Sequence, residues 1–277
     1  MSTAAKAKHK ASHHVNHPDN QNIAGIDFGA TLTKIAFQIP GQRGLALFSS
    51  ADHSLTELSR ILRRYDITHA NTVGIGQRPK ELQWLTIQQP AHNQVQHELM
   101  NQVAGVRQLS TLPKSFLLVS IGTGTSYTHV SGARIIPEPI GSTLGGGYIV
   151  GMSRALGFKD FSHVCLAAAL GNHKNVDLYH KQLIVSHMQN ATARTGKKDL
   201  AAGIMNTVAV NIWKDIVHAS QATQIVCIGS TLVNNPRLTT LLKTYLRQSG
   251  RTAILLCNGE YAGAIGALSN ALIETKH

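Results

Sequence analysis

Two glycine- and threonine-rich turns, each lying between apolar β-type runs, constrain this chain more than any other feature. The first turn lies in IAGIDFGATLTKIAF, residues 23–37, and the second in FLLVSIGTGTSYTHV, residues 116–130. In each, a β-run breaks at small residues and then resumes, which predicts a hairpin. The tip of such a hairpin exposes backbone N–H groups and threonine hydroxyls that can bind phosphate oxygens. Two tips so far apart in sequence predict a nucleotide held between two lobes, and therefore a phosphotransferase.

The charge of the chain favours small anionic ligands over nucleic acid. The formal net charge is +12, and it arises mainly because acidic residues are few, 14 against 26 basic ones. The basic residues are scattered, and no Lys/Arg run is interleaved with aromatic residues. We therefore expect attraction for nucleotides and phosphates, and no nucleic-acid partner.

Cysteine usage and hydropathy indicate a cytoplasmic protein. Cys165, Cys227 and Cys257 lie in apolar runs without CxxC spacing, which is typical of free thiols in a reducing compartment. No apolar run reaches the length of a membrane span, and no signal-peptide pattern opens the chain. Residues 1–21 are polar and rich in Lys and His, so we expect a disordered tail, with zinc binding by its histidines as the alternative.

The element pattern predicts two α/β lobes. Hydrophobic periodicity indicates helices over residues 54–65, 94–109, 161–170, 201–220, 236–247 and 261–273, and buried strands over 115–121 and 224–228. Residues 171–200 are polar and predict irregular chain. The two glycine-rich hairpins begin similar ββ units, a weak internal duplication, so we expect an N-terminal lobe over 22–113 and a C-terminal lobe over 114–277. Neither a GxGxxG nor a Walker A motif is present.

Polar residues of the first turn suit phosphate chemistry. Asp27 ends an apolar strand and faces the GATLTK turn, where a carboxylate would repel phosphate unless a cation stood between them. Asp27 is therefore a candidate for an indirect Mg²⁺ ligand or a water-orienting acid, and the alternative is an Asx-turn residue that shapes the hairpin. Lys34 could reach a phosphate or simply face solvent.

Three further glycine-containing segments are candidates for nucleotide contacts. The second tip, Gly122–Thr125, allows close backbone approach and adds hydroxyl donors, although Thr123 and Gly124 could equally form an ordinary turn. Gly145–Gly147 precede a helix and could form an anion-binding wall or a hinge. Gly229 and Ser230 end a buried strand and could form a shelf for adenosine.

Glu98 is a candidate general base. It lies on the helix that precedes the central strand. Phosphoryl transfer to an alcohol needs a base, and acids are scarce in this chain. The alternative is an ordinary surface carboxylate.

Taken together, five motifs resemble those of the type II pantothenate kinases, relatives of actin, the Hsp70 ATPase domain and the sugar kinases. They are GIDFGATLTK, SIGTGTSY, IGSTLGGGYIVG, CIGSTLVNN and NGEYAGAIGAL, in the family's order from Ile23 onward. The resemblance implies a two-lobed actin-like ATPase fold (ribonuclease H-like) with duplicated mixed-sheet lobes and flanking helices. It implies phosphorylation of pantothenate to 4′-phosphopantothenate with ATP and Mg²⁺, the first step of coenzyme A synthesis, by a homodimer.

The resemblance also assigns residues. It implies that the first turn holds the ATP phosphates with Mg²⁺, through Asp27, Phe28, Gly29, Ala30, Thr31, Leu32, Thr33 and Lys34. The matching positions for other ATP contacts are Thr123, Gly146, Gly147, Tyr148 and Ser230. The family's base stands seven residues before a glycine, as Glu98 stands before Gly105.

Three departures from the family pattern leave other functions open. The family's Arg before the glycine-rich loop falls on Glu138 here, and a short insertion could bring Arg134 into that role, with Arg78 or Lys80 as further candidates. A GDLTA-like segment is missing or eroded around residues 191–202, and His97 and Leu99 replace the usual neighbours of Glu98. The alternatives are a kinase of another small alcohol and a nucleotide-binding regulator without phosphotransfer. The apolar final helices could form a dimer interface or belong to the core.

Overall fold

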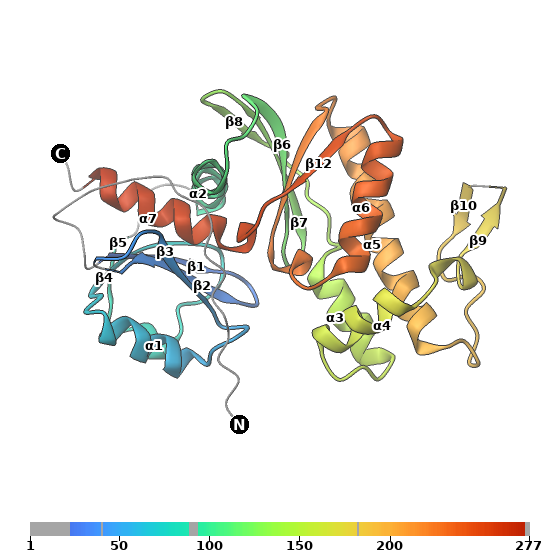
Figure 1. The fold of residues 1–277 in the computed structure, drawn as a ribbon, viewed down its shortest axis with the longest axis horizontal. Coiled ribbons are helices and arrows are strands. Elements are labelled where there is room, and N and C mark those ends of the chain that lie inside the picture. Colours follow the sequence, from blue (N-terminus) through green and yellow to red (C-terminus); the bar gives the residue numbers. More distant parts are fainter. Residues whose placement is uncertain (1–22, 40, 89–93, 182, 275–277) are drawn as a thin grey trace. The chain divides into compact units, whose positions relative to one another are not determined.

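The computed structural model describes residues 23–39, 41–88, 94–181 and 183–274, which fall into two compact units (Figure 1). The first unit lies within residues 1–109 and 261–277, and the second spans 110–260. The last helix, α7 (Ala262–Glu274), therefore belongs to the first unit, although the sequence placed it in the C-terminal lobe. The reason is packing, because α7 contacts strands and a helix of the first unit.

The first unit is built on a mixed five-stranded sheet. Its strands are ordered β3 (Leu45–Ser49), β2 (Thr33–Gln38), β1 (Ile23–Phe28), β4 (His69–Val73) and β5 (Thr86–Gln88). β1 pairs antiparallel with β2, which pairs antiparallel with β3, while β4 lies parallel to both β1 and β5. The predicted hairpin at the first turn is thus present as β1–β2.

One face of this sheet is covered by an amphipathic helix, α1 (Leu55–Arg64). Ser54 and Glu57 form a capping box at its start, which satisfies two backbone N–H groups of the first turn. Leu58 and Leu62 are fully buried and pack with Ala24, Ile26 and Phe28 of β1. The short 3₁₀ helix η1 (Lys80–Leu82) completes this core with Leu82.

Helix α7 and helix α2 (Gln94–Leu109) pack backbone to backbone. A Cβ added at Gly105 of α2 would lie 1.9 Å from the carbonyl oxygen of Ala262, and one at Gly266 would lie 1.9 Å from that of Asn101. α7 also contacts β1, where a Cβ at Gly25 would meet the Ala264 carbonyl at 1.9 Å. The apolar face of the final helix is therefore core, which was one of the two roles left open for it.

The second unit repeats the first sheet. Its order is β8 (Arg134–Pro137), β7 (Thr125–Ser131), β6 (Ser115–Ile121), β11 (Gln224–Ile228) and β12 (Thr252–Leu255). β6, β7 and β8 are antiparallel neighbours, while β11 lies parallel to both β6 and β12. Strand order and direction match the first sheet position by position, which confirms the predicted duplication.

Helices α3 (Gly146–Ala155), α4 (Phe161–Leu170), α5 (Lys197–Ala219) and α6 (Pro236–Gln248) belong to the second unit. Leu117, Val119 and Ile121 of β6 pack with residues of α5 such as Ile204 and Val208. Near the sheet lie two short 3₁₀ helices, η3 (Ser230–Leu232) and η4 (Gly259–Tyr261).

Residues 171–200, expected to be irregular, contain ordered elements. They form η2 (His173–Asn175), the two-stranded hairpin of β9 (Leu178–His180) and β10 (Leu183–Ser186), and the start of α5. The buried carboxylate of Asp177 organises them: it accepts hydrogen bonds from Asn206 Nδ2 at 2.7 Å and from the Met188 N–H at 3.0 Å. His173 Nδ1 and His187 Nδ1 lie 3.3 and 3.6 Å from it.

Three further expectations concern the cysteines, membrane-spanning helices and the N-terminal histidines. All three cysteines are free thiols. Within the described ranges, no helix has the length and apolar character needed to cross a bilayer. The histidines of the N-terminal tail lie outside the described residues.

Candidate active site

Asp27 and Lys34 form an ion pair at the first turn. The two residues face each other across β1 and β2, and Lys34 Nζ lies 3.3 Å from Asp27 Oδ2. Both side chains are largely buried. Gly74 and Gly263 leave room for the carboxylate: a Cβ at Gly74 would lie 2.7 Å from Oδ1, and one at Gly263 would lie 3.1 Å from Oδ2.

The second carboxylate oxygen of Asp27, Oδ1, is suited to lie near a bound cation. Asp27 Oδ1 is buried and has no hydrogen-bond partner among the described residues. Burial raises the pKa of Asp27, whereas the charge of Lys34 and its hydrogen bond oppose that rise. A buried carboxylate oxygen without a donor is costly, and a hydrated Mg²⁺ supplies both charge and donors. The residues present therefore fit the metal that the resemblance implies.

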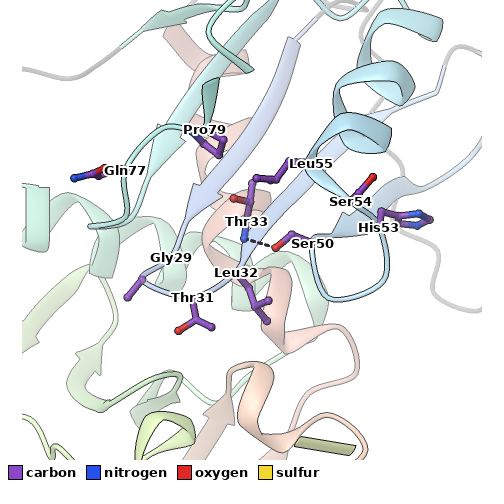
Figure 2. Close-up of a pocket in the computed structure, with 11 residues that line it drawn as sticks. Gly29, Thr31, Leu32, Thr33, Ser50, His53, Ser54, Leu55, Gln77 and Pro79 are labelled. Carbon is purple, nitrogen blue, oxygen red and sulfur yellow. Dashed lines mark hydrogen bonds between the residues drawn. The ribbon is translucent and has the colours of Figure 1, made fainter. Parts of the chain in front are cut away.

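The turn after Asp27 borders a cavity of about 560 Å³ within the first unit (Figure 2). Gly29 N–H donates to Leu32 O at 3.1 Å, and Ala30 and Thr31 are exposed at the tip. Thr33 is fixed behind it, because its N–H donates to Ser50 Oγ at 2.9 Å. The lining residues are Gly29, Ala30, Thr31, Leu32, Thr33, Ser50, His53, Ser54, Leu55, Gln77 and Pro79. The cavity is within the size range of small-ligand pockets.

The side chain of Phe28 faces the core and not the predicted turn. It is only 5% exposed and packs in the core with α1. Its carbonyl accepts the Gly76 N–H at 2.6 Å, which ties the turn to the segment after β4. The side chain of Phe28 is therefore structural, because alternate residues of β1 point to opposite faces of the sheet.

Glu98 belongs electrostatically to the same site. Burial is the largest influence and the negative charge of Asp27 the second, and together they raise the pKa of Glu98 to about 7, against the charge of Lys34. A carboxylate with such a pKa exchanges protons near neutral pH, as a general base must. One oxygen, Oε1, accepts a hydrogen bond from Gln102 Nε2 at 3.1 Å.

The second turn is braced by its own unit. Gly122 N–H donates to Gly124 O at 2.8 Å, and Thr125 is held by hydrogen bonds to Ser142 and to the Leu144 carbonyl. Thr123 and Gly124 are exposed at the tip. These two residues are therefore accessible to a ligand, while Thr125 is buried.

Gly145–Gly147 support this tip. The Gly146 N–H donates to Gly122 O at 2.7 Å and the Gly147 N–H to Thr123 O at 2.9 Å, so neither group is available for an anion. A Cβ at Gly145 would lie 2.8 Å from Gly122 O. The expected anion-binding wall is thus partly wrong: these glycines allow α3 to dock on the tip. Tyr148 packs, half-buried, against the core.

Ser230 is brought to the same place by parallel pairing of β6 and β11, since both strands end at this edge. Its neighbour Thr231 donates from Oγ1 to Gly122 O at 2.8 Å. Gly229 has φ +112°, and a Cβ there would lie 2.2 Å from Ile121 O, so only glycine allows this approach. The second tip, the glycine loop and Ser230 therefore form one cluster.

Arg134 lies away from this cluster. It pairs with Ser131, which pairs with Ser115 at the start of β6, whereas the tip follows the end of β6. Seven strand residues separate the two ends, roughly 20 Å. The insertion therefore does not carry Arg134 to the second tip, because the β7–β8 turn fixes its register.

The other candidates for the missing Arg have different roles. Arg78 donates to the carbonyl oxygens of Leu82 and Leu85, so its guanidinium supports η1. Lys80 is exposed on η1. Glu138, at the position expected for Arg, lies 2.5 Å from His129 Nε2. The position therefore carries an acid–imidazole pair.

Sequence reasoning missed some residues around the first turn. Ser50, His53, Gln77 and Pro79 line the cavity from the segments after β3 and after Gly76. No motif marks them, because they are brought together only by the fold. Gln102 could have been found, since it stands four residues after Glu98 on a predicted helix and such residues face each other.

Sequence comparison supports the resemblance drawn from the motifs. Residues 80–190 match the family described as Fumble. The type II pantothenate kinase of Oceanobacillus iheyensis is 30% identical over 264 residues, which cover 88% of this chain and 97% of that protein. That of Bacillus thuringiensis subsp. konkukian is 28% identical over 275 residues, which cover 91% of this chain and 98% of that protein.

Solved structures share the fold at low sequence identity. Component A of (R)-2-hydroxyglutaryl-CoA dehydratase from Acidaminococcus fermentans has a TM-score of 0.64 and 17% identity, covering 92% of this chain and 99% of that one. The activator of 2-hydroxyisocaproyl-CoA dehydratase from Clostridium difficile, with bound ADPNP, has a TM-score of 0.63 and 16% identity, covering 92% and 95%. These likenesses confirm the actin-like ATPase fold. The identity to the Oceanobacillus protein, over nearly its whole length, shows that the chain belongs to the type II pantothenate kinase family.

Proposed function

We propose that this protein phosphorylates pantothenate to 4′-phosphopantothenate with ATP, the first step of coenzyme A synthesis. The observation that carries the proposal is the cluster of Asp27, Lys34 and Glu98 beside an exposed glycine-containing turn. It combines a phosphate-binding turn, a cation-compatible carboxylate and a base whose pKa is about 7. The choice of pantothenate as substrate follows from the relatives named type II pantothenate kinase.

In this mechanism the first turn binds phosphate. The exposed tip at Ala30 and Thr31 faces the phosphate oxygens, and Lys34 adds positive charge. Asp27 would hold Mg²⁺ indirectly, and the metal would supply charge that neutralises the phosphates. Glu98 accepts the proton of the primary hydroxyl of pantothenate as that oxygen attacks the terminal phosphorus of ATP, and the bond from this phosphorus to ADP breaks so that ADP leaves.

The second unit contributes nucleotide contacts in this proposal. Thr123 and Gly124 are exposed at a tip whose backbone is fixed from behind, and Ser230 adjoins the same cluster. A tip that is held in place before the ligand arrives loses little entropy on binding. We therefore assign phosphate contacts to Thr123 and Gly124, and an adenosine contact to Ser230.

The test is a coupled assay with ATP, Mg²⁺ and pantothenate on the unaltered protein and on Glu98→Gln. The substitution keeps the shape and removes the base, so turnover should fall by about a hundredfold or more while ATP affinity stays the same. Glu81→Gln, the same chemical change elsewhere in the first unit, is the control and should keep normal turnover. Undiminished turnover in Glu98→Gln would remove Glu98 from the mechanism.

A kinase of another small alcohol is the second candidate, and one observation favours it. The position expected for Arg holds Glu138 paired with His129, and Arg134 lies at the far end of the sheet. An acid in place of that Arg would repel the carboxylate of pantothenate. A panel of pantothenate, sugars and other small alcohols separates the two candidates, and ATP binding without turnover of any of them would indicate a regulator.

We further propose a cytoplasmic homodimer that uses an apolar surface of the second unit. Leu166 and Leu170 of α4 are 66% and 72% exposed, and Leu183 and Val185 of β10 are also exposed. Leu166 and Leu170 stand one helical turn apart on the same face of α4, and exposed apolar patches mark association surfaces. Sedimentation velocity of the unaltered protein and of Leu170→Asp should give a dimer and a monomer, and a monomeric unaltered protein would exclude the proposal.

A further inference from the structure

The carboxylate of Glu98 accepts a hydrogen bond from a residue of its own helix. Gln102 stands one turn later on α2 and donates from Nε2 to Glu98 Oε1 at 3.1 Å. Gln102 is only 6% exposed, although glutamine is usually a surface residue. A buried amide at this position therefore needs an explanation.

The orientation of the amide is set by Glu98. Its other end, Gln102 Oε1, is buried and has no hydrogen-bond partner among the described residues. Turning the amide around would place this oxygen against the carboxylate, where two acceptors repel each other. The amide thus makes one hydrogen bond to Glu98 at the cost of leaving an acceptor unsatisfied, which would destabilise a purely structural residue.

The backbone that carries Glu98 and Gln102 is rigidly placed. Gly105 of α2 lies against the Ala262 carbonyl, and Asn101 receives a hydrogen bond from Asn270 of α7 at 2.9 Å. The backbone fixes the Cα of Glu98, but three rotatable bonds still separate it from the carboxylate. The hydrogen bond from Gln102 limits this remaining freedom.

We infer that Gln102 is a positioning residue that holds the carboxylate of Glu98 toward the acceptor hydroxyl. The inference rests on the proposed function, because it gives Gln102 a role only if Glu98 is the base. Gln102 itself does not touch substrate. A misplaced base loses catalytic efficiency without losing substrate binding, since a base must lie within hydrogen-bond reach of its proton.

Gln102→Met is the test, since methionine keeps the length and apolar stem and removes the donor. We expect kcat to fall about tenfold, while KM for ATP and for pantothenate stays within twofold. Gln108→Met is the matched control on the same helix, where Gln108 is exposed and bonds Ser269 instead, and it should leave kcat unchanged. Gln102→Glu, which cannot donate when ionised, should lower kcat at least as much and serves if Gln102→Met folds poorly.

A double-mutant cycle separates positioning from structure. Adding Gln102→Met to Glu98→Gln should cause no further loss, because there is no base left to position. Equal losses in both backgrounds would overturn the inference.

A spectroscopic measurement separates failure of this inference from failure of the proposed function. In protein labelled with ¹³C-glutamate, the carboxyl resonance of Glu98, assigned by its loss in Glu98→Gln, should move in Gln102→Met and not in Gln108→Met. If the Glu98 resonance does not move in Gln102→Met, the hydrogen bond between Gln102 and Glu98 is itself disproved. A moved resonance with full turnover in Glu98→Gln instead overturns the role of Glu98, and with it the positioning role.

Discussion

At the scale of single residues, Glu98 illustrates a conflict between stability and activity. Burial and the charge of Asp27 raise the pKa of Glu98 to about 7, above the value of about 4.3 for a free glutamate. The folded state therefore holds the proton more tightly than the unfolded state. The ionised carboxylate destabilises the fold fully above pH 7, and this penalty disappears as the pH falls toward 4.3.

Glu98→Gln should consequently stabilise the protein while it abolishes most of the activity. At pH 8 we expect a gain of about 1–2 kcal/mol in the free energy of unfolding, a value reduced because solvent screens part of the effect. The gain should shrink toward zero near pH 4.5. Thermal melts of both proteins across this range measure it, and an equal gain at both ends would show that charge is not its cause.

The ionised carboxylate of Asp177 has the opposite effect on stability from that of Glu98. Burial alone would raise its pKa, but the nearby imidazoles of His173 and His187 and the hydrogen bonds from the Met188 N–H and Asn206 together hold the pKa of Asp177 well below its usual range. The ionised carboxylate therefore stabilises the fold fully above about pH 4, and this contribution is lost only below that value, as the pH falls toward the lowered pKa of the folded state.

Asp177→Asn should destabilise the second unit by about 2–4 kcal/mol at pH 7, because the amide cannot accept all of these hydrogen bonds. Chemical denaturation at pH 7 and at about pH 2.5 checks both the size and the sign of this change. The difference between the two proteins should be smaller at the acidic pH, and a difference that grows on acidification would contradict the assignment.

At the scale of elements, contact between helix backbones depends on glycine. Gly266→Ala should destabilise the protein by about 2–3 kcal/mol, because the new Cβ would lie 1.9 Å from the Asn101 carbonyl. Gly151→Ala is the matched control, since a Cβ at Gly151 of α3 meets nothing within 4 Å. It should stabilise by about 0.5–1 kcal/mol through helix propensity alone. Urea denaturation measures the change in the free energy of unfolding in each variant. A change of the same sign in both variants would contradict this account.

The elements that the sequence predicts well are those with a long, regular pattern. The helix over 94–109 and the strand over 115–121 have the same bounds as α2 and β6, because amphipathic or apolar runs specify them. The short strands β5, β8, β9 and β10 have three or four residues each and no comparable pattern. β5 and β8 form by pairing with β4 and β7, and the segment directly before β9 is held by the hydrogen bond of Asn206 with Asp177.

The same distinction applies to the site. The proximity of Asp27 and Lys34 could be predicted, since they flank a local turn, whereas the influence of the Asp27 charge on Glu98 depends on the fold. Arg134 was misplaced because its position depends on the register of the β7–β8 hairpin. The cavity walls at Ser50 and Gln77 come from separate loops, and only the folded chain brings them together.

At the scale of the whole molecule, duplication explains why there are two glycine-containing tips. In each unit the tip joins the central strand of the sheet to its antiparallel neighbour, β1 to β2 and β6 to β7. The first tip carries the Asp27–Lys34 pair and is tied to Gly76, whereas the second tip is braced by Gly146 and Gly147. The two copies have therefore kept one architecture and diverged in chemistry.

The two units also differ in continuity, which has a consequence for folding. Residues 110–260 form the second unit without a break, whereas the first unit needs α7 from the C-terminal end of the chain. Without α7, buried residues such as Ala36 lose their covering partners Ala264, Ile265 and Leu268. Exposure of this sheet face and of the facing side of α2 removes a large part of the apolar burial that stabilises the first unit.

A fragment of residues 110–260 should therefore fold alone, whereas a fragment of residues 1–109 should not. Circular dichroism melts should show a cooperative transition for the first fragment and none for the second, and amide NMR spectra should be dispersed only for the first. Joining residues 261–277 to the end of 1–109 through a flexible linker should restore a cooperative transition, because it returns α7 to β1 and α2. Cooperative folding of 1–109 by itself would show that α7 is an accessory helix, and no folding of the joined protein would show that the first unit requires the second.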